Sequence, residues 1–571
     1  MKSPSPRIPR PCGRSRPRLP EVRARFPRTA ALAWALALGG CAGDEGLPVD
    51  AMSRIDTEGL AAHTRTLASD EFEGRAPATR GEERTIEYLR ASFEEMGLEP
   101  GADGDWYQEV PLVSITADSD MELVVEGGDG TLELAYADDF MAWTKRVIDR
   151  SGLDESELVF AGYGIVAPEY GWNDYEGLDV RGKTVVLLVN DPGYATGDEE
   201  LFRGRSMTYY GRWTYKYEEA ARQGADGALI IHDTGPAGYP WEVVAGSWSG
   251  PQFGLVADDA NLSRLAVEGW LTREAAGALF DAAGRDLEQL EREAAEGGFE
   301  AMPLGLRATV EIRNRVERSV SNNVVALVEG SERPDEVVVY MAHWDHLGVD
   351  ESLEDDPIYN GAVDNATGTA GLLEVAEAFA ALDPPPARSV AFLGVTAEEK
   401  GLLGSAHYVA EPLYPLDRTV AAINMDGLNT VGPMRDITVV GFGSSELDDL
   451  VQEAAARQDR VVRPDPEPEK GFYYRSDHFN FARRGVPALY TDGGIDHVER
   501  GESYGRRMRE AYTAERYHKP SDEYDPSWDL SGAVDDLRLL FEVGYRLAEG
   551  SVWPNWAEGN EFRPVRDEMM R

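Results

Sequence analysis

Short, uniformly apolar runs separated by helical segments fill the second half of the chain. Strands that are apolar along their whole length are typical of parallel sheets buried between two helical layers, whereas half-exposed strands alternate apolar and polar residues. Residues 369–382 have the pattern of one intervening helix. We therefore predict an α/β fold in which a mixed, largely parallel sheet is covered by helices on both faces. The runs are 324–328, 337–342, 390–395, 420–425, 437–440 and 486–490.

Titratable residues follow the ends of three of these runs. His343 and Asp345 come directly after the second run, Glu398 and Glu399 come shortly after the third, and Asp426 follows the fourth. In parallel sheets, ligand sites form outside the carboxyl ends of the strands. We therefore expect these side chains to gather at one edge of the sheet.

Two further residues fit the same site. Asp364 precedes the helix predicted at 369–382, and His518 lies in a late loop. Burying several carboxylates with two imidazoles and few compensating cations is unfavourable for a simple core. Two divalent metal ions remove that difficulty, so the pattern predicts a two-metal hydrolase site.

Length and charge limit the class of protein. A chain of 571 residues is too long for one ordinary core, so two domains and a leader are expected. The formal net charge of -47 argues against a nucleic-acid partner and against adsorption to anionic lipid. Adaptation to salt or genome composition explains such acidity, and attraction of substrates with a free ammonium group is the functional alternative. Oligomeric state is not readable from the sequence.

The first 40 residues have the layout of a signal peptide. An Arg-rich stretch precedes the apolar segment 29–38, which is too short to span a bilayer as a stable helix. Leu38-Gly39-Gly40-Cys41 resembles a bacterial lipobox, which implies cleavage before Cys41 and its acylation. An ordinary secretory signal is the alternative. We expect an exported protein, lipid-anchored at Cys41 in the cell envelope, at the outer membrane or facing the periplasm.

Only two cysteines occur, Cys12 and Cys41, and both lie in the leader region. If Cys41 is acylated, the mature domains contain neither a thiol nor a disulfide. Any metal site must then use nitrogen and oxygen ligands.

Changes in pattern along the chain suggest its division into segments. An amphipathic helix is predicted at 82–97, strands at 106–145, 158–165, 182–189 and 227–231, and a helix around 217–223. The block after residue 145 has no titratable pairs at metal-ligand spacing, so we expect it to shape access to a site elsewhere. The predicted segments are a signal peptide (1–40), a tether (41–51), the first part of a catalytic domain (52–145), an insert (146–300), the main catalytic part (301–550) and a C-terminal tail (551–571).

These strings together resemble peptidase family M28, a family of zinc peptidases, with a β-rich protease-associated (PA) domain inserted into the catalytic domain. The resemblance runs from about residue 55 to 550 and includes the early string Phe72-Glu73-Gly74-Arg75. Each motif is weak alone, but the set is specific. It implies a zinc-exopeptidase fold with two Zn²⁺ ions per chain.

Carried over residue by residue, the resemblance implies a complete set of zinc ligands. His343 would bind one ion, Asp364 would bridge both, Glu399 and Asp426 would ligate separate ions, and His518 would complete the set. Zinc accepts imidazole nitrogen and carboxylate oxygen, and two bridged ions lie roughly 3.5 to 4 Å apart.

Residues next to the ligands are assigned supporting roles. Glu398 is the expected general base, because its neighbour Glu399 ligates metal while Glu398 faces a water whose pKa the metal lowers towards about 7. Asp345 would accept the proton on the other ring nitrogen of His343, and Asp522 would do the same for His518.

The string Arg475-Ser476-Asp477-His478 resembles a family string near the substrate pocket. Asp477 and His478 are therefore expected either to contact substrate or an oxyanion, or to make a structural hydrogen bond. Arg475 is a candidate contact for a substrate carboxylate. His346 is expected to line the site without ligating metal. The remaining histidines, His63, His232, His407 and His497, are expected to be surface or core residues.

The function favoured by this reading is that of a two-zinc aminopeptidase acting on peptides. A carboxypeptidase of the glutamate carboxypeptidase type is one alternative, because it would share the metal ligands but need cationic contacts for a terminal carboxylate. A receptor or binding protein on an inactive peptidase scaffold is the other, although such a protein would be expected to lose ligands.

Overall fold

The computed structural model describes residues 46–128 and 130–571. Residues 48–571 form one compact unit. The predicted signal peptide and lipidation site, Cys41, lie outside the described residues, so both stay predictions. In the part of the chain that is described, no helix is long and apolar enough to cross a bilayer.

The part of the chain that was predicted to be catalytic, called the catalytic part below, is built on the mixed sheet that the apolar runs predicted. Its central strands pair in parallel and are flanked on both sides by antiparallel pairs, but the outermost pair on one side is parallel again. The strand order is β11 (Pro251–Leu255), β2 (Tyr107–Ala117), β13 (Met302–Val328), β17 (Arg388–Val395), β14 (Arg333–His343), β18 (Thr419–Asn424), β21 (Ala488–Gly493), β19 (Asp436–Val439) and β20 (Val461–Pro464).

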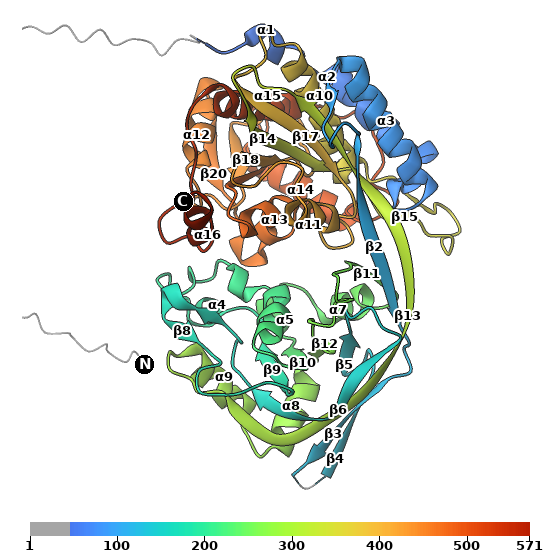
Figure 1. Cartoon of the computed structure of the whole chain (residues 1–571), viewed down its shortest axis with the longest axis vertical. Coiled ribbons are helices and arrows are strands. Elements are labelled where there is room, and N and C mark those ends of the chain that lie inside the picture. Colours follow the sequence, from blue (N-terminus) through green and yellow to red (C-terminus); the bar gives the residue numbers. More distant parts are fainter. Residues whose placement is uncertain (1–45, 129) are drawn as a thin grey trace, which may run out of the picture. The chain divides into compact units, whose positions relative to one another are not determined.

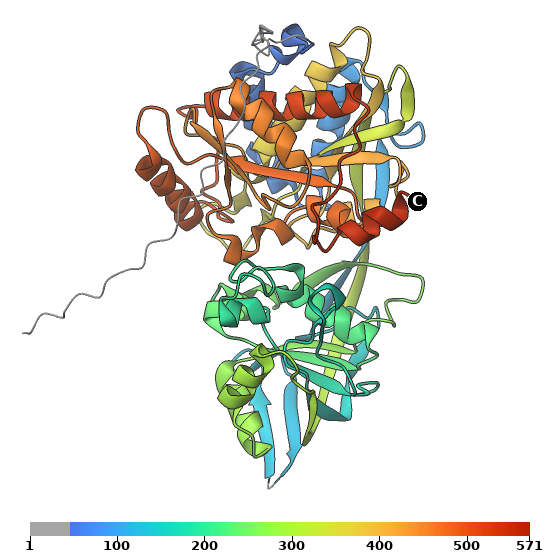
Figure 2. The ribbon, with the colours of Figure 1, turned by 90° about the vertical axis from the view of Figure 1, so that its left-hand side faces the viewer.

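Helices cover both faces of this sheet, as Figure 2 shows. Along β14, Val338 and Tyr340 enter one hydrophobic cluster while Val339 and Met341 enter another, so successive side chains serve opposite faces. The first face packs against α3 (Arg80–Met96), α10 (Gly368–Ala380), α12 (Leu447–Arg457) and α15 (Ser531–Glu549). The second packs against α11 (Leu403–Ala410) and α13 (His478–Arg483).

The amphipathic helix predicted at 82–97 is α3. Thr79 caps its first turn by accepting a hydrogen bond from the backbone N–H of Gly81 at 3.1 Å. Its buried side chains, Leu89 and Phe93, face the sheet. Gly97 ends the helix with φ of 84°, a left-handed conformation that glycine adopts without steric cost.

A second sheet forms the insert. Its strand order is β4 (Gly130–Ala135), β3 (Glu122–Gly127), β13, β6 (Arg150–Phe160), β9 (Thr184–Leu188), β10 (Gly227–Ile231), β12 (Val267–Leu271) and β5 (Phe140–Trp143). The helix predicted around 217–223 is α5 (Trp213–Arg222). Strand β13 belongs to both sheets and runs continuously from one into the other (Figure 1).

The structure moves the predicted boundaries of the insert. Strands β3, β4 and β5 pair within the second sheet, so the insert starts by residue 122 and not at 146. At its other end β13 crosses position 301 without interruption. Alternating residues reveal a strand but not its partner, which explains the misplaced boundary.

The two ends of the described chain are also more ordered than predicted. Residues 49–52 form the short helix α1, and Ala51 is buried in the core, although this stretch was predicted to be tether. Residues 551–571 include α16 (Arg563–Met569), and buried Trp556 donates a hydrogen bond to the Gly485 carbonyl at 2.9 Å. The predicted tail is therefore packed against the catalytic core.

The contacts between the insert and the catalytic part include ion pairs and aromatic pairs. Arg483 of α13 forms an ion pair with Glu218 of α5 at 2.7 Å. The ring of Tyr209 lies 5.2 Å from that of Phe479, centre to centre. These contacts fix the insert against the segment that follows residue 470.

Replacing Phe379 by alanine tests the core beneath the site. Its fully buried ring lies 4.7 Å from Phe541 and 5.6 Å from Tyr340. Phe379→Ala should lower the free energy of unfolding by about 3 to 5 kcal/mol, because it leaves a cavity. Denaturant unfolding measures the change. Phe442→Ala, whose residue is 39% exposed, should cost about 1 kcal/mol or less; equal losses in both variants would contradict the assignment.

Candidate metal centre

The register of three parallel strands places the candidate ligands at one sheet edge. His343, the last residue of β14, lies opposite Val395 of β17, and Met341 lies opposite Asn424 of β18. The segments that leave β17 and β18 therefore start beside His343. Glu398, Glu399 and Asp426 are carried on these segments, as the sequence predicted.

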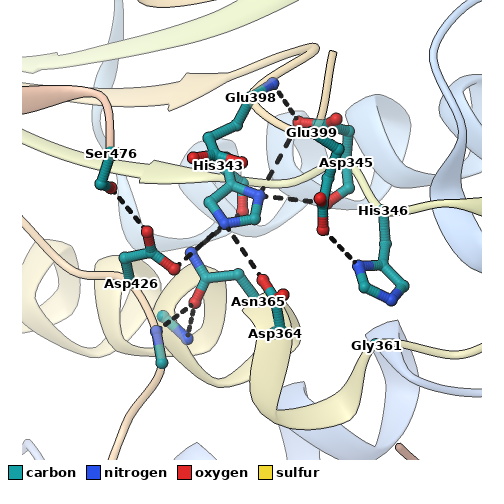
Figure 3. Close-up of polar contacts among 12 residues, drawn as sticks. His343, Asp345, His346, Gly361, Asp364, Asn365, Glu398, Glu399, Asp426 and Ser476 are labelled. Carbon is teal, nitrogen blue, oxygen red and sulfur yellow. Dashed lines mark hydrogen bonds and ion pairs between the residues drawn. The ribbon is translucent and has the colours of Figure 1, made fainter. Parts of the chain in front are cut away.

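One group of donors surrounds the imidazole of His343 (Figure 3). Its Nε2 atom lies 3.2 Å from Asp426 Oδ1 and 3.4 Å from Asp364 Oδ1. Asp364 is carried on η4 (Ala362–Thr367), the turn that leads into α10. His343 and Asp364 are both largely buried.

A second group of donors surrounds His518. Its Nε2 atom lies 3.2 Å from Asp364 Oδ2 and 3.1 Å from Glu399 Oε2. His518 follows α14 (Glu502–Glu515) in a left-handed backbone conformation, with φ of 56°. The two oxygens of Asp364 thus face different imidazoles, which is the arrangement of a bridging carboxylate.

The donor spacing fits zinc. Ligands held at about 2.0 to 2.1 Å around a tetrahedral ion lie roughly 3.3 to 3.4 Å from one another, and the imidazole–carboxylate distances in both groups are 3.1 to 3.4 Å. All donors are nitrogen or oxygen. Five residues, His343, Asp364, Glu399, Asp426 and His518, could therefore hold two ions that share Asp364.

The adjacent glutamates take different sides of the site. Glu398 has a donor atom within 4.8 Å of donors on His343 and Asp426, whereas Glu399 groups with Asp364 and His346. His346 Nδ1 lies 2.7 Å from Glu399 Oε1, so it contacts the oxygen that does not face His518. His346 therefore orients Glu399, and Glu398 is left facing the first group (Figure 3).

Comparison with known proteins places this site in a family. Residues 323–541 match the model of peptidase family M28. These residues form a peptidase family M28 domain. The match begins within β13 and ends within α15, so it contains every candidate ligand.

Individual relatives match the chain over shorter stretches. It is 37% identical to the aminopeptidase NAALADL1 of Mus musculus over 137 residues, 23% of this chain and 17% of that protein. It is 30% identical to a probable zinc metalloprotease of Pyricularia oryzae over 269 residues, 43% of this chain and 51% of that protein. The chain thus spans about half or less of these relatives. An aminopeptidase structure from Aneurinibacillus sp. strain AM-1 aligns over 88% of this chain and 96% of its own, with 18% identity and a TM-score of 0.47.

Burial and neighbouring carboxylates shift the pKa values of the two site imidazoles in opposite directions. Burial disfavours the charged imidazole of His518, but hydrogen bonds to Asp364 and Glu399 raise its pKa to about 10. Burial likewise opposes a charged His343, whereas the carboxylates of Glu398 and Asp426 raise its pKa well above 6.5. Without metal, the carboxylates therefore hold protons on both imidazoles.

Two predicted supporting roles differ in detail from the structure. His343 Nδ1 lies 3.1 Å from the backbone carbonyl of Asp345, while the Asp345 carboxylate is 3.8 Å away and accepts a hydrogen bond from the Glu398 N–H. Asp345 therefore orients His343 through its main chain. The carboxylate of Asp522 accepts hydrogen bonds from the N–H groups of Val363 and Asp364 instead of the predicted bond from His518. Asp522 therefore fixes the turn that carries the bridging ligand.

Sequence reasoning missed two residues that fix the ligands. Ser476 donates a hydrogen bond of 2.5 Å to Asp426 Oδ2 and accepts one from Asn424 at 2.7 Å. Asn365 donates to the Met425 carbonyl and accepts from the Gly427 N–H, each at 3.0 Å. Ser476 adjoins Asp477 and Asn365 adjoins Asp364, two residues that the sequence analysis had assigned to the site. Their position beside those residues was the only signal that could have identified them.

Arg75 holds the surrounding loops together. Its buried guanidinium donates to the carbonyls of Trp344, Leu67 and Gly361 at 2.8 Å and to that of Asn360 at 2.6 Å. Four bonds to the main chain tie the segment after His343 to the segment before Asp364. The early string that contains Arg75 thus acts on the position of ligands far along the chain.

The remaining predicted residues lie behind the site or at its margin. Asp477 is buried and accepts a hydrogen bond from Ser405 at 2.5 Å, and burial raises its pKa to about 7. His478 lies between the rings of Tyr473 and Tyr490, where burial lowers its pKa to about 3. Both observations fit the alternative in which Asp477 and His478 have structural roles and do not contact the substrate. Arg475 is exposed.

Removing the Ser476 hydroxyl should weaken metal binding. Ser476→Ala frees the outer oxygen of Asp426 to rotate, and losing such an outer contact typically reduces metal affinity roughly 10- to 100-fold. Zinc titration against a competing chelator measures this change. Ser352→Ala, at an exposed position, is the control. An unchanged affinity in Ser476→Ala would show that Asp426 needs no such support.

Zinc uptake should release protons. Because the carboxylates keep His343 and His518 protonated at neutral pH in the metal-free protein, neutral imidazole ligands require the loss of about two protons per chain. The raised pKa values set the sign, so zinc affinity should fall as pH falls. Calorimetry at pH 7 in buffers of different ionisation enthalpy counts the protons. A heat independent of buffer would contradict the expectation.

Proposed function

We propose that the protein is a two-zinc exopeptidase, an aminopeptidase that removes N-terminal residues from peptides. The observation that carries this proposal is the pair of imidazole–carboxylate groups sharing Asp364, with Glu398 beside one of them. The M28 match and the names of the two relatives, an aminopeptidase and a probable zinc metalloprotease, support the hydrolytic class.

In this proposal each ion has its own imidazole and terminal carboxylate. His343 and Asp426 would hold one ion, His518 and Glu399 the other, and Asp364 both. When bound, such ions lower the pKa of a shared water towards about 7 and polarise a carbonyl. Glu398 accepts a proton from the attacking water on its carboxylate and passes it to the leaving amine. His346 and Ser476 keep Glu399 and Asp426 in place.

The proposal also covers the cellular location of the protein and the role of its insert. The layout of residues 1–40 and the string ending at Cys41 support export and lipid anchoring in the cell envelope. The insert, with its own sheet, is proposed to be PA-like and to shape access to the metal centre.

A substrate panel tests the reaction class. Purified protein is assayed with a leucine anilide, its N-acetylated form and an N-blocked dipeptide with a free carboxylate, each with and without chelator. An aminopeptidase should cleave only the free amine, and chelator should abolish that cleavage. Cleavage of the blocked dipeptide alone would indicate a carboxypeptidase. No cleavage of any substrate by zinc-loaded protein would support a binding protein.

Replacing Glu398 by glutamine should separate proton transfer from metal binding. Glu398→Gln keeps the size of the side chain but removes the base, so kcat should fall at least roughly 100-fold. Metal analysis should still find two ions per chain, as proposed. Glu411→Gln, at an exposed position, is the matched control. Loss of metal together with activity would instead make Glu398 a ligand.

A further inference from the structure

The turn that follows β17 has a strained main chain directly before the proposed base. Ala397 adopts a left-handed conformation, with φ of 53°, which a residue with a Cβ atom rarely takes. Its methyl group is fully buried against Val110 and Leu112 of β2. The next two residues are Glu398 and Glu399. A conformation of this kind persists only where the surrounding contacts impose it, and such strain gathers at functional sites.

The side chain of Asn323, on β13, joins the two ends of this turn. Its Oδ1 atom accepts a hydrogen bond from the N–H of Thr396, and its Nδ2 group donates one to the carbonyl of Gly404, each at 3.0 Å. The two ends also bond directly, because the Gly404 N–H donates to the Thr396 carbonyl at 2.9 Å. A Cβ atom on Gly404 would lie 2.3 Å from that carbonyl oxygen, so no larger residue fits this contact.

Two hydroxyl groups tie Thr396 to a buried carboxylate. The hydroxyl of Thr396 lies 2.5 Å from that of Ser321, which donates to Glu82 Oε2 at 2.7 Å. Because the single hydroxyl proton of Ser321 is directed at Glu82, Thr396 donates to Ser321. All three side chains are buried. The carboxylate of Glu82, in the first turn of α3, thus sets the direction of both bonds.

The carboxylate of Glu82 is surrounded by donors. It also accepts hydrogen bonds from the side-chain amide of Asn322 at 3.0 Å and from the N–H of Ala78. Burial raises the pKa of Glu82 above its ordinary value, and the bonds from Ala78, Ser321 and Asn322 oppose that change. An ionised carboxylate only accepts hydrogen bonds, and it holds its donors more strongly than a neutral group does.

We propose that Glu82 and Ser321 are positioning residues for the metal centre. Through Thr396 they hold the strained turn in the conformation that directs Glu398 and Glu399 to the two groups of donors. Neither residue belongs to these groups of candidate ligands. For the role of Glu398 as base, the inference rests on the proposed function. The placement of Glu399 is tested through metal binding alone.

Removing the Ser321 hydroxyl tests the connection. Ser321→Ala separates Thr396 from Glu82, so zinc affinity, measured by competition with a chelator, and kcat for a leucine anilide should each fall roughly 10-fold. KM should change little, because no group that binds substrate is removed. Ser319→Ala, at a partly buried position of the same strand, should leave all three values unchanged. Thr396→Val, which keeps the shape of the side chain, replaces Ser321→Ala if that variant does not fold.

A second substitution separates positioning from a general loss of stability. Ala397→Gly removes the steric cost of the left-handed conformation, so in its background Ser321→Ala should change kcat and zinc affinity by about 3-fold or less. A purely structural role predicts the opposite, because losing the buried methyl group as well would add to the damage. Unchanged kcat and zinc affinity in Ser321→Ala, or losses that Ala397→Gly does not reduce, would overturn the proposal.

The two readouts distinguish this proposal from the proposed function. A loss of zinc affinity in Ser321→Ala that Ala397→Gly reduces, with no hydrolysis by the unsubstituted protein, would reject the peptidase function alone. Hydrolysis by the unsubstituted protein, with unchanged kcat and zinc affinity in Ser321→Ala, would reject the positioning role alone.

Discussion

Convergence of carboxylates at one edge of a parallel sheet is the constraint on which the rest of the structure depends. Asp364, Glu399 and Asp426 meet around two imidazoles, and their mutual repulsion is unfavourable in a buried setting. The buried guanidinium of Arg75 donates its hydrogen bonds to main-chain carbonyls. It therefore forms no ion pair with any of these three carboxylates. Divalent ions satisfy this arrangement better than protons do, because each ion compensates two charges and accepts several donors at once.

Precise placement of these ligands depends on the main chain around them. Asn365 joins the turn that carries Asp364 to the segment around Asp426, and Arg75 joins the same turn to the segment after His343. The ligands thus sit on loops, but the loops are held by side chains bonded to carbonyl and N–H groups. Such bonding gives a loop-borne site the rigidity that metal geometry requires.

Local patterns were sufficient to predict the sheet, α3 and α10, because apolar runs and helical periodicity report burial directly. The positions of His343, Glu399 and Asp426 were predictable because they follow strand ends, which a parallel sheet brings together. Asp364 and His518 follow no strand, and the family resemblance supplied their roles as ligands. Long-range pairing was not predictable: nothing local assigns β3 and β5 to the insert's sheet, or turns the Asp345 carboxylate towards Glu398 instead of His343. Ser476 was missed because a single hydroxyl carries no pattern of its own.

Electrostatics act on two length scales in this molecule. The net charge of -47 repels anionic peptides at long range, but salt screens exposed charges beyond about 8 Å at physiological ionic strength. At short range, partly buried charges are screened much less. In the proposed peptidase, selection among peptides would therefore depend on the groups beside the metal centre more than on the field of the whole protein.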